Sequence, residues 1–222
     1  MVFGATGSGK SMSLLQLILM FYGQKPRPKV VWIDNGASSQ RAIEILGGEF
    51  IDLNIQSKMR LNAFDLGPGE KKPTPSKVKL ILAVLETILK DDNLVGLPKR
   101  EKALLEEAIF QCYERIRDRM PTLSDLRAIL MAHAVPSMKA YGEILFSWTG
   151  DTAYGRLLDG QSNITLSKNL TTIEIKGLES FPELQNVFLL LFTAFIQEQA
   201  SKDISQPFVL IIDEAWRLFQ TP

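Results

Sequence analysis

The residues Gly4 to Ser11, read GATGSGKS, combine types and spacing that suit the binding of a phosphate group. They match the pattern G-x-x-x-x-G-K-[ST], whose glycines let successive backbone N–H groups converge on phosphate oxygens. In such a loop the lysine, here Lys10, reaches the β- and γ-phosphates, and the Ser11 hydroxyl is placed to ligand Mg²⁺. The segment therefore predicts a P-loop for a nucleoside triphosphate, expected to be ATP, with Mg²⁺. The candidate nucleotide-binding residues are Gly4, Ala5, Thr6, Gly7, Ser8, Gly9, Lys10, Ser11 and Met12.

A second group of candidate residues follows the apolar run Phe208 to Ile212. An unbroken apolar run predicts a strand buried on both faces of a parallel sheet, and this one ends in Asp213 and Glu214. In a Walker B strand, Asp213 would hold the metal and Glu214 would polarise the attacking water, because γ-phosphate hydrolysis depends on positioning and charge neutralisation. A plain buried strand with an acidic end is the alternative. The pairing with the P-loop favours hydrolysis, with Lys10 and Glu214 as catalytic residues.

Two further polar residues each have a functional and a structural interpretation. Asp34 closes the apolar run Val30 to Ile33, which predicts a second parallel strand. Its carboxylate would lie at the carboxyl edge of the sheet, where it could orient a water or the metal shell, or simply cap the following turn. Arg156, between Gly150 and Gly160, could reach a phosphate in a neighbouring subunit or be an ordinary surface arginine.

The local patterns also predict the elements that must position these residues. Short apolar runs predict strands at 1–3, 30–34, 50–53, 171–175 and 208–212, with 50–53 near a sheet edge. Apolar periodicity predicts helices over 12–22, 39–46, 76–89, 98–119, 122–134, 137–148 and 182–200. We therefore expect an α/β fold. Its P-loop core comprises 1–66 and 150–222, incomplete at both ends, with a linker and an all-α insertion at 67–149.

Composition narrows the class of protein. The 222 residues are 45% hydrophobic, enough to bury a sizeable core. Lys plus Arg equals Asp plus Glu at 25 each, so there is no bulk positive field to attract nucleic acid, and any such contact would be local. The single cysteine, Cys112, excludes an internal disulfide and suits a reducing compartment. The longest apolar stretches are shorter than the roughly 20 residues that span a bilayer.

Several residue groups together resemble the TraC and VirB-four type ATPases of conjugative type IV secretion systems. They are GATGSGKS at 4–11, VWID at 31–34 with Gly36 and Ser38, GRLLDG at 155–160 and FVLIIDEAW at 208–216. The resemblance implies a RecA-like fold and carries the Walker A roles to Lys10 and Ser11 and the Walker B roles to Asp213 and Glu214. It also implies a hexamer that works with other secretion components at the cytoplasmic face of the inner membrane, with possible peripheral membrane contact through regions absent here.

The same residues leave two alternative functions open. One is a DNA translocase of the coupling-protein or HerA/FtsK type, although the neutral charge and the sequence DEAW disfavour it. The other is an assembly platform that binds nucleotide without hydrolysing it. Family members continue beyond Walker B, where a γ-phosphate-sensing arginine or glutamine is expected. If that residue acts in trans and is missing, turnover would fall by about 10³- to 10⁵-fold. Ala63 also stands where the family usually has proline.

Overall fold

The computed structural model of the chain describes residues 10–36, 39–67, 69–90 and 96–213. These residues form two compact units. The sheet unit takes its described residues from 10–54, 165–180 and 199–213, and the helical unit takes its own from 55–164 and 181–198. The expected domain boundaries at 66/67 and 149/150 stay a prediction.

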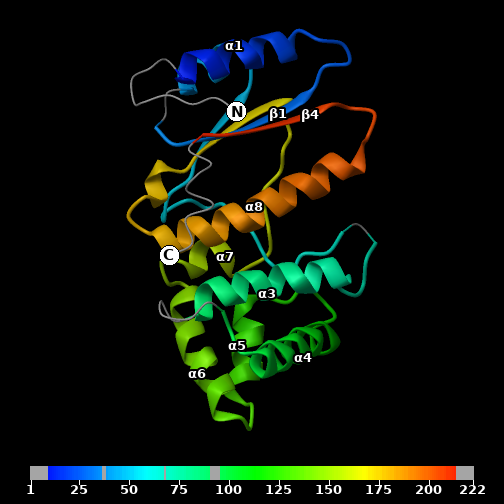
Figure 1. The fold of residues 1–222 in the computed structure, drawn as a ribbon, viewed down its shortest axis with the longest axis vertical. Coiled ribbons are helices and arrows are strands. Elements are labelled where there is room, and N and C mark those ends of the chain that lie inside the picture. Colours follow the sequence, from blue (N-terminus) through cyan, green and yellow to red (C-terminus); the bar gives the residue numbers. More distant parts are fainter. Residues whose placement is uncertain (1–9, 37–38, 68, 91–95, 214–222) are drawn as a thin grey trace. The chain divides into compact units, whose positions relative to one another are not determined.

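In its described part, the sheet unit is built on four parallel strands in the order β2-β3-β1-β4 (Figure 1). Their bounds are β1 Lys29–Asp34, β2 Glu49–Asp52, β3 Leu170–Glu174 and β4 Phe208–Ile212. Parallel neighbours need crossover connections, and here these are long, since β3 and β4 lie far from β1 in the sequence. The expected α/β fold with a parallel sheet is confirmed, as is the edge position of β2 within the described strands.

The strand register aligns the carboxyl ends of the strands. Asp34 pairs with Glu174, and Asp52 pairs with the same glutamate from the other side. Ile33 pairs with Ile212, so the residue after β4 continues the same row. Side chains at one register level point to the same face of a sheet. Each of these four strands therefore has an acidic residue at or just after its carboxyl end, and the four residues share one face of the sheet.

Helices α1 (Lys10–Tyr22) and α2 (Gln40–Ile45) cover that face. Their apolar side chains enclose alternate residues of the strands, because successive strand residues point to opposite faces. Trp32 at the centre is 1% exposed. The cluster consists of Ile18, Val30, Trp32, Ile43 and Leu170, with Leu14, Tyr22, Leu46, Val209 and Ile211 packed against it.

The sequence-based expectation that β4 is buried on both faces is wrong for the described chain. All five of its residues are half-buried, whereas all five of β3 are fully buried. The reason is position: β4 is an edge strand of the described sheet and pairs only with β1 there. An apolar run alone does not distinguish a central strand from an edge strand.

The helical unit confirms the predicted helical stretch after residue 75. It contains α3 Pro75–Leu89, α4 Lys99–Arg115, α5 Leu123–Met131, α6 Pro136–Ile144, the 3₁₀ helix η1 Leu145–Trp148 and α7 Gly155–Leu158. Most of α8 (Pro182–Lys202) also belongs to it, and the short η2 (Lys176–Leu178) belongs to the sheet unit. The apolar stripe of α4 faces the core through Leu105, Ala108, Ile109 and Cys112. Thr122 and Asp125 form the expected capping box.

Candidate nucleotide site

The first turn of α1 contains the last two residues of the predicted P-loop motif, so its position in the sheet unit matters for the site. This helix begins at Lys10, the last but one residue of the motif, and Gly4 to Gly9 lie outside the described residues. Its 13 residues rise about 20 Å, the same as the six residues of β1. The chain turns back directly from Tyr22 to Lys29 and α1 packs on the sheet. The first turn of α1 therefore lies toward the carboxyl edge of the strands (Figure 1).

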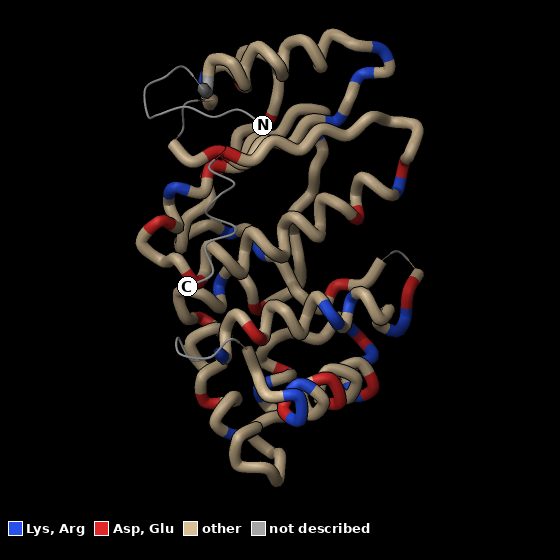
Figure 2. The backbone as a smooth tube through the Cα atoms, in the orientation of Figure 1, with Lys and Arg blue, Asp and Glu red and all other residues tan. Residues whose placement is uncertain are grey.

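At this edge the acidic residues of neighbouring strands are held by main-chain bonds. The Asp213 amide donates to the Ile33 carbonyl oxygen at 2.9 Å, and the Ile175 amide donates to the Asp34 carbonyl oxygen at 3.0 Å. Figure 2 shows acidic residues gathered where the strands end. The predicted metal-holding residue Asp213 and the candidate Asp34 are thus brought side by side, although they are separated by most of the sequence.

Only one of the two carboxylate oxygens of Asp34 accepts hydrogen bonds within the described structure. The residue is 0% exposed, and its Oδ2 accepts hydrogen bonds from the Ser39 amide at 3.2 Å and hydroxyl at 2.7 Å. The capping interpretation is therefore confirmed. Oδ1 is buried and has no hydrogen-bond partner in the described part of the chain. A buried polar atom of this kind is costly unless a water, an ion or a ligand satisfies it. The interpretation that Asp34 orients a water or the metal shell therefore also retains support.

Glu174 belongs to the same row and was missed by the sequence reasoning. It is 3% exposed and accepts hydrogen bonds from the amides of Gly36 and Lys176. The available signal was its place at the carboxyl end of a strand, the same place that singled out Asp34 and Asp213. An isolated acid inside the expected strand 171–175 did not reveal that β3 is the neighbour of β1.

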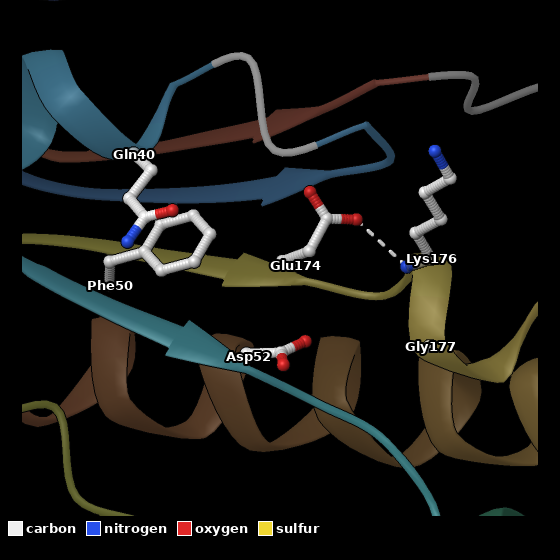
Figure 3. A pocket seen from close by; sticks show the side chains of 6 residues that line it. All are labelled: Gln40, Phe50, Asp52, Glu174, Lys176 and Gly177. Carbon is white, nitrogen blue, oxygen red and sulfur yellow. Dashed lines mark hydrogen bonds between the residues drawn. The ribbon is translucent and has the colours of Figure 1, made fainter.

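A pocket of about 510 Å³ opens at the carboxyl ends of β2 and β3 (Figure 3). Its lining residues are Gln40, Phe50, Asp52, Glu174, Lys176 and Gly177. Gly177 is required here because an added Cβ would come within 2.6 Å of the Leu53 carbonyl oxygen. Ligands of open α/β sheets bind outside the carboxyl ends of the strands, so the pocket extends the region available to a ligand at this edge.

The remaining predicted residues lie in different places. Met12 is 62% exposed on α1. Arg156 is exposed on α7 and belongs to the helical unit, and its role toward a phosphate stays a prediction. Glu214 lies outside the described residues, and the side chains of Lys10 and Ser11 are likewise not described.

The described residues fit a magnesium ion that is bound together with a nucleotide. Among them, no group of three or more His, Cys, Asp or Glu side chains could hold a metal by itself. Mg²⁺ does not need such a group, because it is usually held by one or two carboxylates, waters and substrate phosphates. The buried Oδ1 of Asp34 and the adjacent Asp213 would supply acidic oxygens for this arrangement, and their role as metal ligands stays a prediction.

A parallel sheet with an acidic carboxyl edge, toward which a helix begins at the lysine of a GxxxxGKS motif, defines a P-loop nucleotide-binding domain. More specifically, the chain belongs to the family of TraG P-loop domains, whose family model matches residues 1–221. Among solved structures it is similar to VirB4 of Thermoanaerobacter pseudethanolicus, with a TM-score of 0.78 at 20% sequence identity. That match covers 94% of this chain and 82% of the other. No curated protein matched the chain.

These findings confirm the family resemblance and the P-loop ATPase fold that the motifs predicted. Within the described residues, no helix has both the length and the apolar character needed to cross a bilayer.

Proposed function

We propose that this chain is the motor domain of a type IV secretion ATPase and hydrolyses ATP to ADP and phosphate in the presence of Mg²⁺. In this function, hydrolysis powers pilus assembly and substrate transfer in conjugation. The observation that carries the proposal is the strand register that sets Asp213 beside Asp34 at the carboxyl edge of the sheet. The first turn of α1 lies toward the same edge. Membership of the TraG P-loop family and the fold shared with VirB4 support it.

The roles follow from the chemistry of each residue. The Gly4–Gly9 backbone would bind the phosphates through its N–H groups, with Lys10 on the β- and γ-phosphates. Ser11 and Asp213 would hold Mg²⁺, which when bound neutralises negative charge on the phosphates. Glu214 would take a proton from the attacking water as general base, and Asp34 would orient that water or the metal shell.

The proposed assembly follows the family. Self-association as a hexamer would bring Arg156 of one subunit to a phosphate in the next, and other secretion components would bind at the cytoplasmic face of the inner membrane. Residues 67–149 would form an insertion in the ATPase core and offer a surface for partners or for the lid of the site.

A DNA translocase remains the closest alternative, but the charges of the helical unit do not favour it. Basic and acidic residues are mixed along α4 (Figure 2). Lys102 pairs with Glu86 at 2.7 Å, so the basic group Lys99 to Lys102 is partly neutralised. Binding to DNA without sequence preference requires several uncompensated cations.

The deciding experiment measures ATP turnover over a wide range of protein concentration, with and without single- and double-stranded DNA, beside a nucleotide-binding titration. We expect binding, and turnover that rises steeply with protein concentration and is indifferent to DNA. Stimulation by DNA would favour the translocase. Binding without turnover at any concentration would favour the non-hydrolysing platform.

A further inference from the structure

The carboxylate of Glu174 ties the end of β3 to the turn that follows β1. Both of its oxygens lie 3.0 Å from the amide nitrogen of Gly36. Oε1 also accepts a hydrogen bond from the Lys176 amide at 2.8 Å, the bond drawn in Figure 3. Hydrogen bonds from backbone amides to a buried carboxylate are stronger than neutral ones, because the surroundings screen the charge weakly. Glu174 therefore fixes the main chain two residues beyond Asp34.

The backbone conformation at position 36 favours glycine. Gly36 has a φ of +153°, a backbone conformation that other residues rarely adopt, and an added Cβ would meet no atom within 4 Å. Backbone freedom, and not lack of space, is thus the reason for glycine here. Farther along, Asp34 holds the Ser39 amide and hydroxyl at the start of α2. Two buried carboxylates therefore hold the described residues after β1, Glu174 at Gly36 and Asp34 at Ser39.

The direction of the Asp34 carboxylate depends on both attachments. Its Oδ2 is directed by Ser39, which leaves Oδ1 buried without a partner in the described structure. Gly36 lies two residues after Asp34, so a displacement of Gly36 would change the backbone from which the Asp34 side chain reaches Ser39. We propose that Glu174 is a positioning residue for the nucleotide reaction, which acts by holding Gly36 so that Asp34 presents its free oxygen beside Asp213. This inference rests on the proposed ATPase function.

The test compares two substitutions at this position. Glu174→Ala removes both acceptor oxygens, whereas Glu174→Gln keeps one acceptor and places an N–H₂ group where the other oxygen was. The matched control is Glu49→Gln, at the amino end of β2. The probes are Mg·ADP, for ground-state affinity, and Mg·ADP with aluminium fluoride, which mimics the transferring phosphoryl group and does not require turnover. Two further measurements are kcat and the NMR amide resonance of Gly36.

A displacement of about 1 Å in positioned groups can cost about 10²-fold in rate. For Glu174→Ala we expect a loss of that order in kcat and in aluminium fluoride complex affinity, with Mg·ADP affinity unchanged and a shifted Gly36 resonance. Glu174→Gln should lose less, and the control nothing.

Wild-type values of kcat and analogue affinity in folded Glu174→Ala would overturn the inference alone. Equal losses of ADP and analogue affinity would also overturn it, because they would indicate a general structural role. A wild-type chain that neither binds Mg·ADP nor hydrolyses ATP would overturn the proposed function, and the inference with it.

Discussion

The main-chain amide of Asp213 donates a hydrogen bond to the carbonyl oxygen of Ile33, at 2.9 Å. This bond extends the β1–β4 ladder by one step beyond the last strand residue, so that Asp213 lies beside Asp34. Two acids that the sequence separates by most of its length therefore meet at one sheet edge.

Replacing Lys10 with alanine should weaken nucleotide binding, because the charge-assisted contact to the β- and γ-phosphates is lost. Such contacts contribute about 1.5–3 kcal/mol, so the affinity for Mg·ATP should fall roughly 10- to 100-fold. Calorimetric titration measures the change. Lys168→Ala, on an exposed residue near the amino end of β3, is the matched control and should bind normally. Wild-type affinity in Lys10→Ala would remove the P-loop assignment.

Glu214→Gln should separate binding from hydrolysis. The amide keeps the size of the side chain but cannot accept a proton from water, and losing a general base typically costs about 10²- to 10⁴-fold in rate. We expect kcat for ATP to fall by that amount while the dissociation constant for Mg·ATP is retained. Glu44→Gln, exposed on α2, provides the control. Undiminished turnover would mean that another group is the base.

Asp125→Ala should destabilise the helical unit. Asp125 accepts two hydrogen bonds from the Arg119 guanidinium, at 2.7 and 2.8 Å, and one from the Thr122 amide at 2.8 Å. Loss of a helix N-terminal cap costs about 0.5–2 kcal/mol. Urea unfolding at neutral pH should show a loss in this range. Asp151→Ala, exposed in the same unit, should show almost none.

The effect of Asp125 should also depend on pH. Burial alone would raise the pKa of its carboxyl, but the hydrogen bonds from Arg119 and Thr122 outweigh burial and hold the pKa below its ordinary value of 3.8. The contribution to stability is therefore present above that value and is lost as the pH falls through the folded-state pKa. The difference in free energy of unfolding between wild type and Asp125→Ala should shrink under acid conditions. A constant difference would show that charge is not involved.

Cys112 should resist alkylation in the folded protein. Its side chain is 0% exposed on α4, and burial raises the pKa of the thiol to about 12. Since the thiolate is the nucleophile, iodoacetamide at pH 8 should label the native chain far more slowly than the urea-unfolded chain. Mass spectrometry follows the modified fraction. Equal rates in the two states would contradict the packing of α4.

The sequence by itself determined the features that depend on short spacings. The P-loop motif, the apolar run of β4 with its acidic end, and the periodic helices between residues 75 and 148 could all be predicted locally, because each depends on residues a few positions apart. Those motifs also sufficed to indicate the family, which the match to the TraG P-loop domain confirms. The capping box at Thr122 and Asp125 belongs to the same group of local features.

Only the tertiary structure decided which strands are neighbours and which residues share an edge. Strand β1 lies between β3 and β4, and that order depends on crossover connections of many residues, which no local pattern specifies. Glu174 could not be recognised before β3 was placed beside β1. The half-buried state of β4 was mispredicted for the same reason. Local propensity sets the type of each element, whereas burial and proximity depend on long-range packing.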